Sequence, residues 1–183
     1  MKNYIFILML FLAFLGEKSH AQYKVEPPKG YSQNIGNMVS MLDNLKNRVE
    51  RIVQNLDVKG TDFLLDEDAN SPGAIIYHLA ATEAYYQVYT FEGRQFNAEE
   101  EEMWMTALNL GDNARERYKG KPISYYLNIY NEVREKTKKL LKEKDDAWFA
   151  EQNGQMTNHW AWFHVMEHQA NHMGQLALIT KRL

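Results

Sequence analysis

The sequence predicts an all-α protein: a four-helix bundle with a short extra helix in the connection between the second and third long helices. Three observations support this fold class. Apolar residues recur at steps of three and four in four long segments. No segment shows the alternating pattern of a half-buried strand. Apolar residues make up 45% and aromatic residues 13% of the 183 residues, which is enough to form a packed core rather than a disordered chain.

The four long helices are separated by polar or glycine-containing breaks. The first is expected from the apolar spacing of Ile35, Val39, Leu42 and the positions that continue it. The third has a similar apolar side, and it follows a break at Gly120 and Pro122. The expected ranges are 31–56, 72–91, 123–142 and 158–183.

Two helix starts carry clear local signals. Ser71 is a good N-cap, and Pro72 fits the first helical position, where its missing N–H costs no hydrogen bond. Asn97 followed by Glu100 resembles a capping box. This second signal predicts the short extra helix, which should run through Leu110 and end at Gly111.

The first 21 residues have the features of a secretory signal peptide. Lys2 supplies a positive start, 4–15 is an unbroken apolar run, and Ser19 and Ala21 are small residues at the positions that a signal peptidase reads. The run is shorter than the ~20 residues needed to span a bilayer. We therefore expect cleavage and export to the periplasm or the cell exterior, without stable membrane insertion afterwards. A retained N-terminal anchor is the alternative.

The remaining chain divides into an extended leader at 22–30 and one helical domain at 31–183. The formal net charge of the whole chain is −3, so the basic surface of a nucleic-acid binder is missing and no nucleic-acid partner is expected. Cysteine is absent. The fold therefore has no disulfide, and no thiolate can serve as nucleophile or metal ligand.

Histidines provide the strongest functional signal. On a helical wheel of the last helix, His168 and His172 lie in or beside the arc of its aliphatic residues, together with Gln175. His164 lies at the edge of this arc, and His159 points toward solvent. Imidazoles at i and i+4 can converge on one metal ion. Two inward histidines that are satisfied by hydrogen bonds alone remain the alternative at this point.

A third histidine favours the metal site. His78 lies in the second long helix, near the edge of an apolar stripe. Three histidines from two facing helices would leave one coordination position open, which is typical of catalytic rather than structural metal sites. Imidazole ligands suit Zn²⁺ or Ni²⁺ best, and Fe²⁺ less well.

The sequence resembles the DinB/YfiT-like superfamily of bacterial metal-binding four-helix bundles. The resemblance rests on the segments 71–80 and 164–175, which contain the single histidine of the second helix and the His-x-x-x-His pair followed by x-Gly-Gln. It implies that His78, His168 and His172 are the metal ligands and that Gln175 supports them. Family members often have an arginine where this chain has Met173.

Two functional hypotheses follow. The resemblance implies a metal-dependent transferase, similar to thiol S-transferases, or a hydrolase, acting on a small molecule. Glu83 faces the buried side of its helix and is the candidate for an acid/base or supporting role. The alternative is a periplasmic metal or ligand carrier without turnover, which could form a homodimer through a flat helix face.

Overall fold

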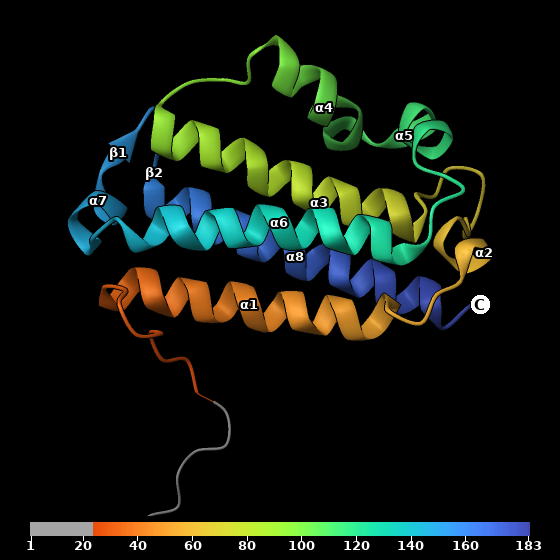
Figure 1. Ribbon diagram of the computed structural model, residues 1–183, viewed down its shortest axis with the longest axis horizontal. Coiled ribbons are helices and arrows are strands. Elements are labelled where there is room, and N and C mark those ends of the chain that lie inside the picture. Colours follow the sequence, from red (N-terminus) through yellow and green to blue (C-terminus); the bar gives the residue numbers. More distant parts are fainter. Residues whose placement is uncertain (1–23) are drawn as a thin grey trace, which may run out of the picture.

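The computed structural model describes residues 24–183, and the predicted signal peptide lies outside this range. Four long helices form the bundle (Figure 1). They are α1 (Gln33–Val53), α3 (Pro72–Gln87), α6 (Ile123–Lys142) and α8 (Asn158–Thr180). The all-α class is confirmed. No helix within the described residues combines the length and the apolar character needed to cross a membrane.

The direction of the helices explains the long connection between α3 and α6. Helices α1 and α8 run one way along the bundle, and α3 and α6 run the opposite way (Figure 1). The chain must therefore return along the whole bundle between α3 and α6, which a tight turn cannot do. It returns through α4 (Ala98–Asn109), which packs against α3, and then through α5 (Gly111–Arg117).

Burial follows the apolar pattern in the outer helices but not in α3. Helix α1 buries residues at steps of three and four, among them Ile35, Met38, Val39 and Leu42. Helix α3 is buried on most of its surface because it packs against α4, α6 and α8. The helix that supplies His78 therefore lies at the centre of the molecule.

Both predicted helix caps are present. The Ser71 hydroxyl accepts a hydrogen bond from the Ala74 amide at 3.3 Å, and Pro72 opens α3. Asn97 and Glu100 form a reciprocal capping box at the start of α4. Such caps satisfy amides that have no partner within the helix, so they fix where α3 and α4 begin.

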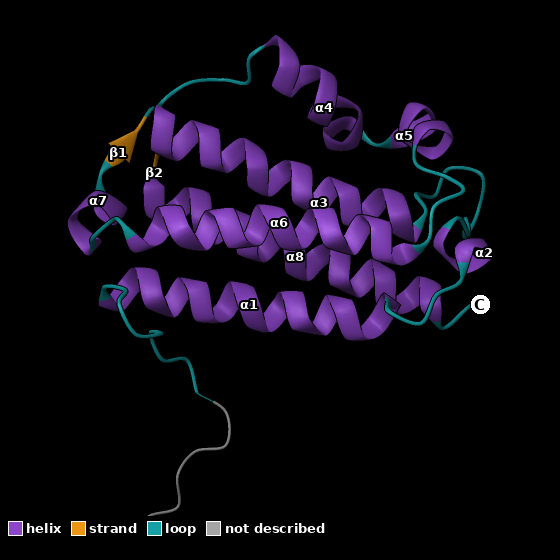
Figure 2. Cartoon of the chain, in the orientation of Figure 1, coloured by secondary structure: helices purple, strands orange, loops and turns teal. Residues whose placement is uncertain are grey.

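Several short elements differ from the prediction (Figure 2). The connection between α3 and α6 holds two helices rather than one. Leu110 adopts a φ of 54° between them, and Gly111, which was expected to end the short helix, instead begins α5. Helix α3 also widens at its end into a π-helical turn. This turn, η1, spans Val88–Glu92. The other unpredicted elements are α2 (Val58–Thr61), α7 (Asp146–Ala150) and a hairpin of β1 (Gln152–Asn153) and β2 (Met156–Thr157).

Candidate metal centre

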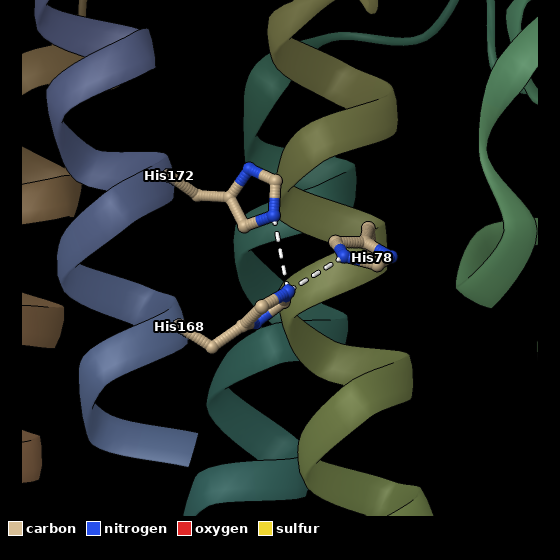
Figure 3. A group of neighbouring side chains, drawn as sticks. All are labelled: His78, His168 and His172. Carbon is tan, nitrogen blue, oxygen red and sulfur yellow. Dashed lines mark hydrogen bonds between the residues drawn. The ribbon is translucent and has the colours of Figure 1, made fainter. Parts of the chain in front are cut away.

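The three predicted histidines meet between α3 and α8. His78 projects from α3, and His168 and His172 project from α8 toward it (Figure 3). The Nε2 atoms of His78 and His168 are 3.0 Å apart, and those of His172 and His168 are 3.1 Å apart. One candidate ligand atom from each ring lies within 4.8 Å of the other two. The three histidines are therefore positioned to bind a metal ion.

Local helix geometry produces this convergence. His168 and His172 are one turn apart on α8, with ring centroids separated by 4.5 Å. The close packing of α3 against α8 brings the ring of His78 to within 4.8 Å of each of the other two centroids. Two helices that are fixed by their own apolar contacts thus present three nitrogens to one point.

The outer nitrogens of two rings are held by acceptors. Nδ1 of His78 donates a hydrogen bond to the Ala107 carbonyl at 2.8 Å. Ala107 is in the last turn of α4, where helix carbonyls lack intrahelical partners. Nδ1 of His172 donates to Oε1 of Gln175 at 2.8 Å. These bonds place the proton on Nδ1 in both rings, so each Nε2 presents a lone pair to the shared point.

This arrangement of protons leaves the inner nitrogens poorly satisfied without a cation. His168 Nε2 faces both lone pairs, yet a neutral imidazole nitrogen carries at most one proton. At least one lone pair therefore faces another nitrogen without a hydrogen between them. A cation at the shared point would accept all three lone pairs at once, which is the chemistry expected of a metal site.

The distances from Nε2 of His168 to the Nε2 atoms of the other two rings also suit a metal ion. Bonds of about 2.0–2.1 Å arranged tetrahedrally place two ligand nitrogens roughly 3.3 Å apart, and an octahedral arrangement places them roughly 2.9 Å apart. The distances of 3.0 and 3.1 Å lie between these values. No carboxylate of the described residues belongs to the group. Three neutral ligands would leave coordination positions for water or a substrate.

Burial favours the neutral form of all three rings in the metal-free protein. Burial lowers the pKa of His78 to about 4. Burial, together with the neighbouring His172, His78 and His164, lowers the pKa of His168 to about 3. Burial also lowers the pKa of His172, opposed by its hydrogen bond to Gln175. Neutral imidazoles are the form that binds metals, so no proton has to be displaced near pH 7.

The other two histidines in α8 lie outside the group. The ring of His164 is one turn before His168, at 5.8 Å between centroids, and its Nδ1 is 3.3 Å from a Glu167 carboxylate oxygen. His159 is exposed and stacks on Phe149. Both placements agree with the wheel, which put His164 at the edge and His159 toward solvent.

Glu83 lies in a buried polar network rather than in the histidine group. Its two carboxylate oxygens accept hydrogen bonds from Nε and Nη2 of Arg134, each at 2.8 Å. The Thr137 hydroxyl donates to Oε1 at 2.6 Å, and Arg134 also donates to Gln169 on α8. Glu83 and Arg134 are each 1% exposed. The carboxylate that sequence analysis selected for proton transfer is therefore occupied by core partners.

Arg134 is the main residue that sequence reasoning missed. It lies on α6 beside Tyr130 and Thr137, within the stripe that faces the core. A charged side chain on a buried stripe requires a buried counter-charge, and Glu83 was the acidic residue on the buried side of α3. Pairing the two would have predicted the ion pair from sequence.

The fold and the histidine group together define the class. One histidine from the second long helix and a His-x-x-x-His pair from the last, facing each other across a four-helix bundle, are the features of the DinB/YfiT-like superfamily. Within it, the chain belongs to the mycothiol-S-transferase family, whose sequence model matches residues 37–183. The match covers all four long helices except the first four residues of α1. No curated protein matches the chain.

Proposed function

We propose that the chain is a metal-dependent S-transferase that joins a low-molecular-weight thiol, of the mycothiol type, to a small electrophile. The observation that carries this proposal is the set of three Nε2 atoms aimed at one point, with two of them held as lone-pair donors by Ala107 and Gln175. Membership of the mycothiol-S-transferase family supports the choice of reaction.

In this proposal His78, His168 and His172 hold one divalent cation, with Zn²⁺ or Ni²⁺ favoured by the all-imidazole donor set. The bound cation would lower the pKa of a coordinated thiol, so that the thiolate is present near pH 7. The protein residues fix the position of the nucleophile: Ala107 orients His78 and Gln175 orients His172. Because no carboxylate from residues 24–183 joins the group, the thiol proton leaves to solvent.

Two other activities compete with this proposal. The same open position could hold a water molecule as the nucleophile of a hydrolase. A carrier would bind the cation without turnover. The predicted signal peptide would favour a carrier if the mature chain works in the periplasm, because low-molecular-weight thiols are chiefly cytosolic. A homodimer and export both stay predictions.

Elemental analysis of untagged protein tests the metal site. We expect about one divalent ion per wild-type chain and loss of the ion in His172→Ala. His164→Ala is the matched control, because His164 lies on the same face of α8 but outside the group. Equal metal content in wild type and His172→Ala would refute the assignment.

Activity assays then separate the three functions. Metal-loaded wild type should consume thiol and electrophile in equal amounts, and His172→Ala should lose this rate. Ester hydrolysis without thiol consumption would favour the hydrolase. Bound metal with neither activity, across a panel of electrophiles and esters, would favour the carrier.

A further inference from the structure

Aromatic side chains continue the histidine group along α8 toward the β-hairpin. On α8, Trp160, His164, His168 and His172 follow one another at steps of four residues, which places them along one side of the helix. The rings of Trp160 and His164 are stacked, with centroids 5.3 Å apart and planes inclined by 6°. From α3, Tyr86 meets His164 edge-on at 5.8 Å. We call Tyr86, Trp160 and His164 the aromatic platform.

The platform is accessible and is placed beside the metal group. Trp160 is 48% exposed, and together with Gln155, Met156 and Thr157 of the hairpin it lines a hollow of about 400 Å³. This volume is within the usual range for small-molecule sites. His164 is in ring contact with His168. The His164 ring therefore adjoins the first ligand of the proposed cation, at 5.8 Å between centroids, and Trp160 lies one further helical turn away.

The charges around the platform disfavour an anionic ligand. No lysine or arginine of the described residues makes an ion pair or a cation–π contact with the three platform residues. The one charged contact is acidic, between Glu167 and His164. Phosphate and carboxylate groups are usually recognised by arginine or lysine. The surface instead suits a flat, uncharged ring.

Tyr86 differs from the two tyrosines beside it in its hydrogen bonding. Its neighbours Tyr85 and Tyr89 donate hydrogen bonds to Gln95 and Asn153. Within residues 24–183 the Tyr86 hydroxyl makes no hydrogen bond with another side chain or backbone group. Burial raises the pKa of Tyr86, so the hydroxyl keeps its proton near neutral pH and can donate to a polar substituent.

We propose that the aromatic platform binds a flat, uncharged aromatic electrophile, so that its reacting carbon points toward the histidine group. This inference rests on the proposed S-transferase function and names the substrate class for it. With an aryl halide, the thiolate sulfur forms a bond to the ring carbon, the carbon–halogen bond breaks, and the halide leaves with the bonding pair. The proton of the low-molecular-weight thiol goes to solvent.

An unreactive probe tests the platform without catalysis. 1,3-Dinitrobenzene is planar and has no leaving group, and its binding to metal-loaded protein can be measured by calorimetry or saturation-transfer NMR. Because aromatic stacking is worth about a factor of two to ten in affinity, Trp160→Ala should bind it about tenfold more weakly, and Trp160→Phe should retain most of the affinity. Phe163→Ala is the matched control: Phe163 is 43% exposed on the same helix and makes no ring contact with the platform.

The shape of the probe provides a second arm. Nitrocyclohexane has a similar size but is not planar, and it should bind weakly and equally to wild type and Trp160→Ala. The inference is overturned if Trp160→Ala binds 1,3-dinitrobenzene as wild type does, or if Phe163→Ala weakens binding as much as Trp160→Ala. Trp160 is largely exposed, so its replacement leaves the core intact, and circular dichroism verifies this.

Turnover with two electrophiles links the platform to the reaction. Trp160→Ala should lower kcat/KM for 1-chloro-2,4-dinitrobenzene about tenfold more than it lowers kcat/KM for iodoacetamide, a small aliphatic electrophile. Equal losses for both would contradict an aromatic binding surface. The proposed function is decided separately, because it fails if His172→Ala keeps its metal and its rate, whatever the probe binding shows.

Discussion

Replacement of Glu83 by leucine removes the partner of a guanidinium group that is almost completely excluded from solvent. In Glu83→Leu, Arg134 would keep its hydrogen bond to Gln169 at 3.1 Å and a contact with Asp43 at 3.4 Å, but it would lose both short bonds to a carboxylate. Removing one member of a buried ion pair typically costs about 3–5 kcal/mol. For a chain of this size, that corresponds to a decrease of roughly 6–20 °C in Tm.

A double-mutant cycle separates the pair from its surroundings. Glu83→Leu combined with Arg134→Met replaces both charges by apolar side chains of similar volume, so its free energy of unfolding should return to within about 2 kcal/mol of wild type. Thr137 retains an acceptor in the double variant, because its hydroxyl also contacts the Val133 carbonyl. Asp43→Asn is the control: Asp43 is one-third exposed, so the change should cost less than about 1 kcal/mol.

Urea and thermal unfolding followed by circular dichroism at pH 7 measure these changes, with metal content determined on the same samples. Metal content should be equal in wild type and Glu83→Leu at temperatures where both are folded. A Glu83→Leu variant with an unchanged Tm and no transferase activity would refute the core assignment. Glu83 would then have to act in the reaction itself.

Two further predictions concern the histidine group. Gln175→Ala removes the acceptor that orients His172, so metal affinity should fall about 10–100-fold in a competition assay with a chelator. The Tm of the metal-free protein should stay unchanged. An unchanged affinity would show that Gln175 plays no supporting role. In metal-free protein, the pKa values of His78 (about 4) and His168 (about 3) are lowered, so these rings bind protons at a higher pH in the unfolded chain than in the folded protein. The free energy of unfolding should therefore fall as the pH decreases from about 6.5 toward 4, and a flat urea-denaturation profile over this interval would contradict the burial of neutral rings.

Sequence periodicity identified the helices whose packing has one clear side. Helix α6 has the predicted bounds, and α1 and α8 differ from the prediction by a few residues at their ends. Each of the three has exposed and buried faces, so its apolar residues recur with the helical period. The wheel of α8 could place His168 and His172 inward because five aliphatic residues fixed the buried arc. The pair was thus predictable from the residues alone.

Helix α3 and the short elements illustrate where this reasoning stops. Because α3 is surrounded by three helices, its residues are apolar on most sides, and the wheel could place His78 only near the edge of a stripe. The third histidine was therefore predicted less directly than the pair, and the family resemblance implied the same residue. The helices α2 and α7 have four and five residues and each strand of the hairpin has two, so these elements are too short to establish a period. Their shapes depend on contacts and caps, such as the bond from the Gly60 amide to Asp57 at 2.7 Å.

The bond between the Ala107 carbonyl and His78 has a consequence for how this architecture can change. A carbonyl from the return segment orients a ring on the central helix, so residues 98–111 act as a brace for the histidine group. A minimal bundle that kept only the two histidine-bearing helices would leave that ring free to rotate. Shortening of the return segment, by evolution or by design, should therefore succeed only where another acceptor replaces Ala107, whereas insertions near Gly93, at the exposed end of α3, leave the brace in place.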